Sequence, residues 1–152
     1  MSDRFNTLRI IHFGMIMPII VFSGVVLFLN SGSEEAADVS RIEELRYIPG
    51  LLLMLAFWMA PSLFKKQVRN AVKPTSTLED KLAIYQSAHI VKMALFEAAA
   101  LFGLVESFVN NHWFNFLIVA IVLLIFVSNM PTVSRFSMIF DLSVEEKNEL
   151  NT

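Results

Sequence analysis

Four long apolar runs constrain the fold of this chain more than any other feature of its sequence. Residues 10–29, 48–64 and 113–130 contain no charged side chain, and residues 84–105 contain only two. At about 1.5 Å per residue, a helix of about 20 residues spans the roughly 30 Å hydrocarbon core of a bilayer. The runs therefore predict four membrane-spanning helices.

Composition supports this prediction. Apolar residues make up 55% of the chain and charged residues 17%, compared with about 45–50% and 25% in soluble domains. A soluble helical bundle would show polar faces at a period of 3.6 residues, and three of the runs are apolar all round. A cleaved signal peptide is the other alternative for residues 10–29, but that run exceeds the roughly 7–15 residues of a signal core. We predict an all-α fold, a four-transmembrane-helix bundle in one domain over residues 1–152, with a tail at 131–152.

The placement of lysine and arginine predicts the orientation, because basic loops resist translocation across a membrane. Only Arg41 and Arg46 lie in the first connection, among several acidic residues, and the third connection has neither lysine nor arginine. Nine basic residues lie in the two tails and the second connection: Arg4, Arg9, Lys65, Lys66, Arg69, Lys73, Lys81, Arg135 and Lys147. We expect both termini to be cytoplasmic, in an inner (plasma) membrane that the chain crosses several times.

A weak internal repeat relates the two halves of the chain. His12 falls on His89 at an offset of 77 residues, and the ends of the second and fourth runs align at Pro61 and Pro131, an offset of 70. Such a repeat predicts two tandem helical hairpins in parallel orientation, related by an axis along the membrane normal. Chance similarity between apolar segments is the alternative explanation.

Glu97 lies near the midpoint of the third run, where a charged side chain costs about 2.5–3.5 kcal/mol. Two interpretations are open: an ion- or proton-binding carboxylate, or a neutral carboxylic acid that hydrogen-bonds a neighbouring helix and fixes the register of the bundle. Lys92 lies about 140° around the helix from Glu97, too far for a simple pair, and is expected to extend toward the cytoplasm. Glu97, Lys92 and His89 are the ion-binding candidates.

A stripe of small residues, Ala99, Gly103 and Ser107, repeats every four positions along the third run. Small side chains let helix backbones approach closely in membranes. We predict that this stripe packs against a neighbouring helix, either in the same chain or in a second copy.

His12 and His89 lie at the cytoplasmic ends of the first and third runs. Two histidines that project inward from parallel helices could bind haem b as axial ligands. Polar helix ends at the membrane interface are the alternative interpretation. No other metal site or cofactor is expected.

Several function classes are disfavoured by what the sequence lacks. There is no cysteine for disulfides or thiolate metal sites. A net charge of −2 provides no basic excess for nucleic acid. The chain contains no phosphate-binding glycine loop, no HExxH motif and no serine nucleophile elbow, so we do not expect an enzyme.

The stretch His89-Ile-Val-Lys-Met-Ala-Leu-Phe-Glu97-Ala-Ala-Ala-Leu-Phe-Gly103-Leu-Val resembles the ion-carrying helix of rotary ATPase proteolipid (c) subunits over about 17 residues. The resemblance implies that Glu97 is an ion-binding carboxylate. The chain departs from that family in having only five glycines and in placing Glu97 on the first helix of a hairpin rather than the second. The whole chain is similar to small uncharacterised four-helix membrane proteins common in bacteria.

The residues together favour a non-enzymatic membrane component, either a small subunit of a larger complex or a self-assembling homo-oligomeric bundle. The first alternative is a proton- or cation-translocating protein that uses Glu97, and the second is a bis-histidine haem b protein. The expected partners are the lipid bilayer and other membrane proteins or copies of this chain.

Overall fold

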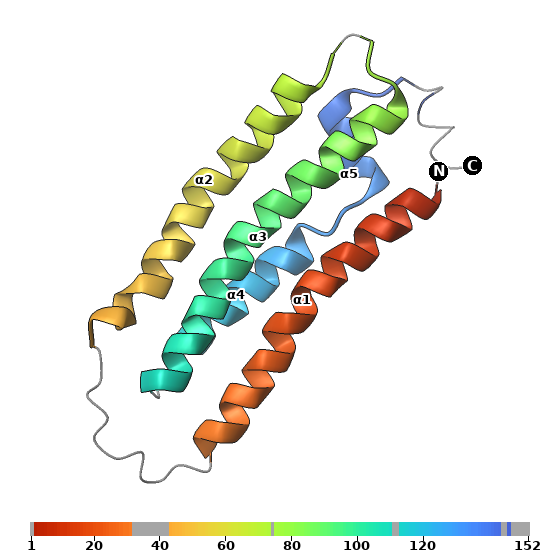
Figure 1. The fold of residues 1–152 in the computed structure, drawn as a ribbon. Coiled ribbons are helices and arrows are strands. Elements are labelled where there is room, and N and C mark those ends of the chain that lie inside the picture. The colour runs from red at the N-terminus through yellow and green to blue at the C-terminus, as the bar shows by residue number, and fades with distance from the viewer. Residues whose placement is uncertain (1, 32–42, 74, 111–112, 144–145, 147–152) are drawn as a thin grey trace.

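The computed structural model describes residues 2–31, 43–73, 75–110, 113–143 and 146 (Figure 1). Over this part of the chain every regular element is helical, which confirms the predicted all-α class. The elements are α1 (Ser2–Ser31), the short 3-10 helix η1 (Glu43–Tyr47), α2 (Ile48–Ala71), α3 (Leu78–Asn110), α4 (Asn115–Ser128) and α5 (Val133–Phe140).

The first three long helices extend well beyond the apolar runs that predict them. The longest, α3, has 33 residues, about 50 Å at 1.5 Å per residue, so its ends project past a bilayer core. In contrast, α4 has only 14 residues and is about 21 Å long. The run at 113–130 therefore does not form one uninterrupted spanning helix.

Local residue chemistry accounts for the helix ends. Pro49 stands in the first turn of α2, where its missing N–H costs nothing. Pro131 follows α4 closely and disfavours helical backbone at the residue before it. Thr132 caps α5 by accepting a hydrogen bond from the backbone N–H of Arg135, and Asp141 ends α5 in the left-handed region at φ 46°.

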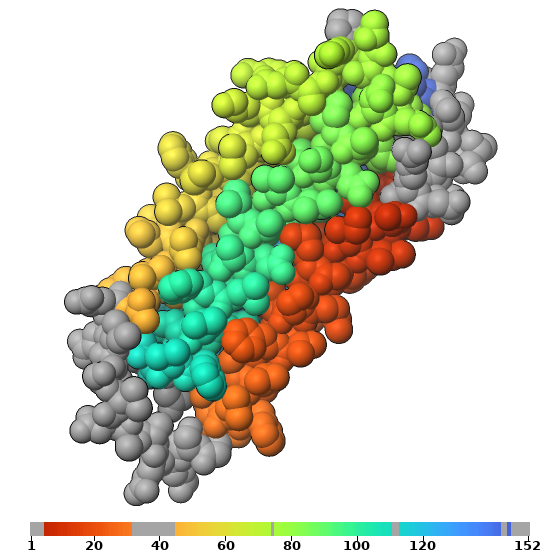
Figure 2. Space-filling view, viewed as in Figure 1, coloured from red at the N-terminus to blue at the C-terminus, as the bar shows by residue number. Residues whose placement is uncertain are grey.

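The central helix of the bundle is α3. Its largest interfaces are with α2, α4 and α1, and in Figure 1 it lies between α2 and α1 with α4 behind it. The space-filling view shows α3 as the middle strip of this face, flanked by α2 and α1 along most of its length (Figure 2). Residues on several sides of α3 are consequently buried.

Two apolar clusters fill the interior. The larger one lies between α1, α2, α3 and α4 and includes Ile19, Phe96, Leu104 and Phe126. The smaller one lies at the end of the bundle where α1 and α3 begin, and it packs Phe5, Leu8, Leu82, Tyr85, Phe136 and Leu142 together. This second cluster fixes α5 against the starts of α1 and α3.

The outer surface of the helices is apolar as well. Ile10, Phe28, Trp58 and Leu124 are all more than 65% exposed. Three helices are long and apolar enough to cross a membrane, or four if α4 and α5, which meet at a 75° bend, together form one span. Contiguous apolar surface of this extent is typical of a chain that contacts lipid.

One end of the helices carries a concentration of basic side chains. The connection between α2 and α3 lies at the same end as α5 and the start of α1 (Figure 1). Lys65, Lys66, Arg69, Lys73 and Lys81 lie in this connection and the helix ends beside it. We call it the basic end. α1 ends and η1 begins at the other end, and residues 32–42 between them fall outside the described part of the chain.

Candidate functional site

Two histidines from different helices meet inside the bundle. The side chains of His12 on α1 and His89 on α3 are 1% and 3% exposed. The His12 Nδ1 and His89 Nε2 atoms are 3.1 Å apart, and the His12 Nε2 atom is 3.1 Å from the backbone oxygen of Phe126 on α4. His12 therefore joins three helices through two hydrogen bonds.

These contacts define where the protons lie. A carbonyl oxygen can only accept, so His12 Nε2 carries a hydrogen and donates it to Phe126. In neutral His12 the Nδ1 atom is then an acceptor, and the His89 Nε2–H donates to it. One added proton at His89 Nδ1 leaves both hydrogen bonds in place, whereas a second would set two N–H groups against each other. The arrangement can hold one extra proton.

The pair lies at the place where α4 ends inside the bundle. The last carbonyl groups of a helix lack partners within that helix. Here the backbone N–H of Asn129 caps the oxygens of Ile125 and Phe126 at 2.9 and 3.1 Å. The Phe126 oxygen accepts in addition from His12, and the Asn129 side-chain amide donates to the oxygen of Ile125 at 2.8 Å. Lys92 Nζ donates to Asn129 Oδ1 at 2.6 Å, which also sets a cation near the negative end of the α4 dipole.

Aromatic rings enclose the histidines. The Tyr85 ring stacks on His89 with centroids 5.9 Å apart and an interplanar angle of 27°. The Phe126 ring lies 5.3 Å from His12. Tyr85 also meets Phe136 of α5 edge to face, so the smaller apolar cluster separates the histidine pair from the surface of the basic end.

The structure places the three ion-binding candidates in two separate regions of α3. His89 and Lys92 lie near the end of α4, where His12 and Asn129 join them. Lys92 is half-buried, and its ammonium lies 5.6 Å from the centre of the Phe64 ring. Glu97 is half-buried and lies about 12 Å along α3 from His89. Within the described residues, no hydrogen bond or ion pair joins its carboxylate to another group.

A more deeply buried carboxylate lies near the other end of α3. Glu106 is 1% exposed and accepts hydrogen bonds from the side-chain amides of Asn110, at 3.2 Å, and Asn115. The sequence-based prediction singled out Glu97, near the midpoint of the third run, and missed this cluster. The spacing of Glu106 and Asn110, four residues apart on one helix face, was the available signal.

The small-residue stripe packs against other helices of the same chain. Ala99 and Ser107 are fully buried. A Cβ atom built on Gly103 would lie 3.6 Å from Pro49 Cβ of α2 and 3.7 Å from Asn115 Cβ of α4. The backbone oxygen of Ser107 accepts from the Asn30 side chain of α1 at 3.1 Å. The stripe lets α1, α2 and α4 all approach α3 closely.

The histidine arrangement does not fit haem. Axial imidazoles bind the iron from opposite faces of the porphyrin, so the macrocycle must lie between the two rings. His12 and His89 instead hydrogen-bond each other directly, and the other ring nitrogen of His12 donates to the backbone oxygen of Phe126. No group of three acidic or histidine side chains that could hold a metal ion occurs among the described residues.

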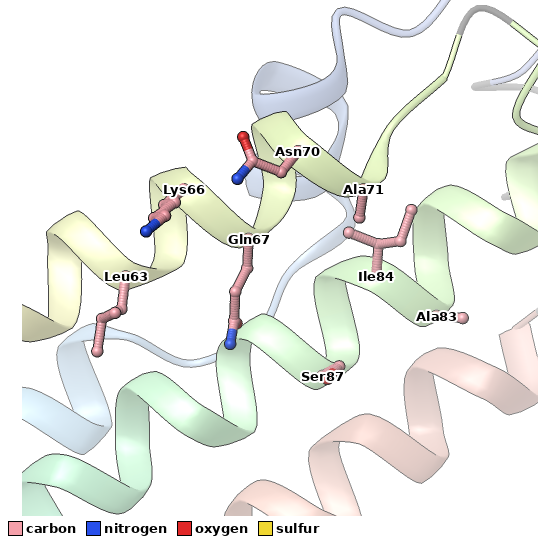
Figure 3. Close-up of a pocket in the computed structure, with 8 residues that line it drawn as sticks. All are labelled: Leu63, Lys66, Gln67, Asn70, Ala71, Ala83, Ile84 and Ser87. Atoms are coloured by element: carbon pink, nitrogen blue, oxygen red, sulfur yellow. The ribbon is translucent and has the colours of Figure 1, made fainter.

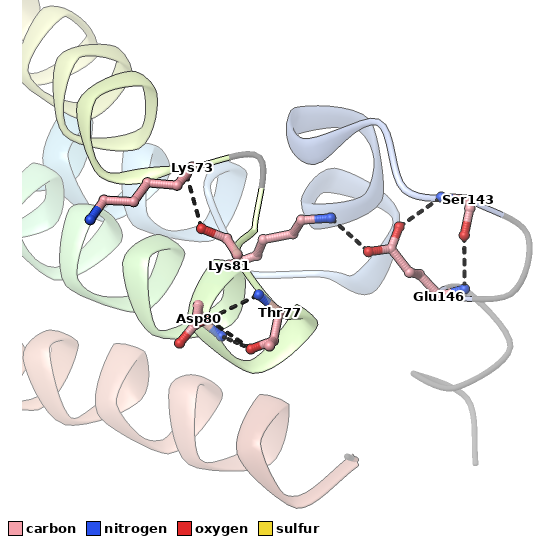
Figure 4. A network of polar contacts seen from close by, with 7 residues as sticks. Lys73, Thr77, Asp80, Lys81, Ser143 and Glu146 are labelled. Atoms are coloured by element: carbon pink, nitrogen blue, oxygen red, sulfur yellow. Dashed lines mark hydrogen bonds and ion pairs between the residues drawn. The ribbon is translucent and has the colours of Figure 1, made fainter.

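Two reciprocal caps and an ion pair organise the basic end (Figure 4). Ser143 and Glu146 form a capping box. The Ser143 backbone N–H donates to Glu146 Oε2 at 2.9 Å, and the Glu146 backbone N–H donates to Ser143 Oγ at 3.2 Å. Thr77 and Asp80 cap α3 in the same way. Lys81 Nζ lies 2.6 Å from Glu146 Oε1. The hydrogen bond from Lys81, followed by that from the Ser143 backbone, lowers the pKa of Glu146.

Comparison with protein-family models, curated proteins and solved structures finds no match to this chain.

Proposed function

We propose that this chain is a non-enzymatic membrane bundle that binds a single proton at its buried His12–His89 pair. The observation that carries the proposal is the 3.1 Å contact between His12 Nδ1 and His89 Nε2, with His12 Nε2 held on the Phe126 oxygen. Histidine is the side chain that exchanges protons most readily near neutral pH. Buried ionisable groups within a membrane mark proton and ion sites.

The break after α4 supports this assignment. Irregular backbone at membrane depth persists only where it is enclosed by protein or lines a cavity. In many transporters, the C-terminal ends of such broken helices hold the coupling cation or proton through their free carbonyl groups. The Phe126 oxygen at the end of α4 is in contact with His12. Movement of a proton onto the pair would therefore change the charge beside the C-terminal end of α4.

In this proposal, the chain crosses a bacterial inner membrane four times and both termini are cytoplasmic. The bent α4–α5 segment is the fourth crossing, with α5 near the membrane surface. The concentration of Lys65, Lys66, Arg69 and Arg135 at the basic end supports a cytoplasmic position for that end. The apolar belt of exposed side chains on α1, α2 and α4 supports contact with lipid.

A constant register between α1 and α3 supports the tandem-hairpin arrangement. The His12–His89 and Asn30–Ser107 contacts both join residues that are 77 positions apart. The two helices therefore run parallel, and equivalent positions of the repeat face each other across 18 residues. The second and fourth helices differ more, since α2 has 24 residues and α4 has 14. In this proposal, the break in α4 is the feature that the two hairpins do not share.

Proton or cation movement through Glu97 is the second candidate. Glu97 lies between the histidine pair and Glu106, about 12 Å along α3 from His89 and about 13 Å from Glu106. The absence of a described hydrogen-bond partner for its carboxylate favours a group that exchanges its proton over one that fixes bundle register. The three sites together form a series of titratable groups along one helix.

Proton flux into proteoliposomes separates the two candidates, with Glu97→Gln as the decisive variant because it keeps the shape of the side chain and removes its titration. If Glu97 carries the proton, flux stops in Glu97→Gln while the protein remains folded. Unchanged flux in Glu97→Gln excludes that mechanism. Proton uptake by the histidine pair, measured as protons taken up per folded chain on acidification, falls by one when both imidazoles are removed in His12→Gln/His89→Leu, and it falls by the same amount in a Glu97→Gln background. Equal uptake in wild type and His12→Gln/His89→Leu would exclude the proposed proton site.

Assembly into a homo-oligomer or a larger membrane complex remains part of the proposal. The Ala99, Gly103 and Ser107 stripe is enclosed by neighbouring helices of the same chain, so a contact between copies would use another surface. Native-mass measurement in a mild detergent tests this point. A strictly monomeric species, with no partner recovered from gently solubilised membranes, would contradict it.

A further inference from the structure

A groove of about 1040 Å³ lies between α2, α3 and α5 at the basic end, where nothing in the proton-binding proposal uses it. Four cationic side chains line it: Lys65, Lys66 and Arg69 from α2, and Lys92 from α3. Asp141 is the only acidic residue among the lining side chains. The remaining walls are largely apolar and include Phe64 and Phe140.

The exposed face of α2 continues this groove toward the middle of the bundle. Leu51, Leu55 and Trp58 are 59%, 42% and 75% exposed. Together with Ser62, Lys65 and Arg69 they recur at spacings of three and four residues, so all six lie along one stripe of the helix. The stripe is apolar along its first half and cationic along its second.

We propose that this groove binds the headgroup of an anionic phospholipid from the leaflet at the basic end. The phosphate lies between Lys65 and Arg69, one helical turn apart, and the half-buried Lys92 ammonium forms the cationic floor. An acyl chain lies along Leu51, Leu55 and Trp58. Charge complementarity selects an anionic lipid over a zwitterionic one of the same chain length, since basic pockets between membrane helices bind anionic headgroups.

A second groove between α2 and α3 provides a contrast within the same molecule (Figure 3). It has a volume of about 740 Å³ and one cationic lining residue, Lys66, while Gln67 points from α2 toward α3. Lys66 lines both grooves, whereas Lys65 and Arg69 line only the larger one. Substitution of Lys65 and Arg69 therefore tests the larger groove alone.

Tryptophan quenching by lipids with brominated acyl chains tests the proposal. The Trp113→Phe protein retains Trp58 as its single tryptophan. It is reconstituted into phosphatidylcholine vesicles that contain either brominated phosphatidylglycerol or brominated phosphatidylcholine at the same low fraction. We expect stronger quenching of Trp58 by the anionic lipid. Each cation near a membrane surface contributes about 1 kcal/mol to the binding of an anionic lipid. In Lys65→Gln/Arg69→Gln, the affinity for the anionic lipid relative to the zwitterionic lipid should therefore fall about fivefold for each cation lost.

Lys73→Gln is the matched control, because it removes one charge from the same end of the bundle, is exposed and lines neither groove. Its preference for the anionic lipid should remain near the wild-type value. Equal quenching by both lipids in the Trp113→Phe protein, or an equal loss per charge in Lys73→Gln, would overturn the proposal. Loss of the preference in inorganic phosphate but not in sodium chloride of equal ionic strength would show that the site binds a free anion instead.

Discussion

The two hydrogen bonds of His12 predict that its replacement destabilises the bundle more than replacement of His89. His12→Leu removes the contact to His89 and the contact to Phe126, and it leaves the buried His89 Nε2–H without this acceptor, while the Phe126 oxygen keeps the backbone N–H of Asn129 at 3.1 Å. Hydrogen bonds between membrane helices contribute about 0.6 kcal/mol on average and up to about 1.7 kcal/mol. We expect His12→Leu to cost about 1–3 kcal/mol and His89→Leu, which removes one bond, about half as much.

Two amide substitutions separate the bonds of His12. Asn places its amide near the position of Nδ1 and can restore the contact to His89 but not the contact to Phe126. Gln reaches the position of Nε2 and can restore the bond to the Phe126 oxygen. Reversible unfolding in mixed micelles should rank the variants with wild type most stable, Asn and Gln intermediate, and Leu least stable. Equal free energies of unfolding for His12→Leu and His89→Leu, or no recovery in either amide variant, would refute this reasoning.

Two further predictions concern the basic end and the topology. Because the pKa of Glu146 is lowered in the folded state, its pairing with Lys81 stabilises the fold above the unfolded pKa of about 4.3 and is lost as the pH falls through the folded value. Glu146→Gln should therefore lower the free energy of unfolding by at most about 1 kcal/mol near neutral pH and by less at acidic pH. An equal loss of stability at neutral and acidic pH would contradict this prediction. In intact cells, single cysteines at Ser33 and Ser76 should differ in labelling by an impermeant thiol reagent, with only the first accessible, and equal labelling of both would exclude four crossings.

The sequence predicts the helices well where apolar runs are long, because satisfying the backbone in lipid leaves few alternatives to a helix. It does not predict the shortening of α4. Residues 113–130 carry no charge to the end of the run, and the helix ends at Ser128 because Asn129 and Pro131 change the backbone. The separate helix α5 was likewise not predicted, since eight residues with an exposed Met138 provide no long apolar signal.

The site is only partly readable from the sequence. The alignment of His12 with His89 identifies two residues that the structure brings into contact, although it does not indicate whether they bind a metal or each other. Phe126 could not be predicted as their partner, because the contact uses its backbone oxygen and depends on how α4 packs against α1. Glu106 was missed since one of its two amide partners, Asn115, lies on a different helix.

The most direct test of the proposed proton site is nitrogen NMR of histidine-labelled protein in lipid nanodiscs, followed through a pH titration. The His112→Gln background leaves His12 and His89 as the two labelled residues. We predict a through-hydrogen-bond coupling between His12 Nδ1 and His89 Nε2, and the uptake of one proton by the pair while that coupling persists. Two independent titrations, one at each ring and with no coupling between the nitrogens, would contradict the account.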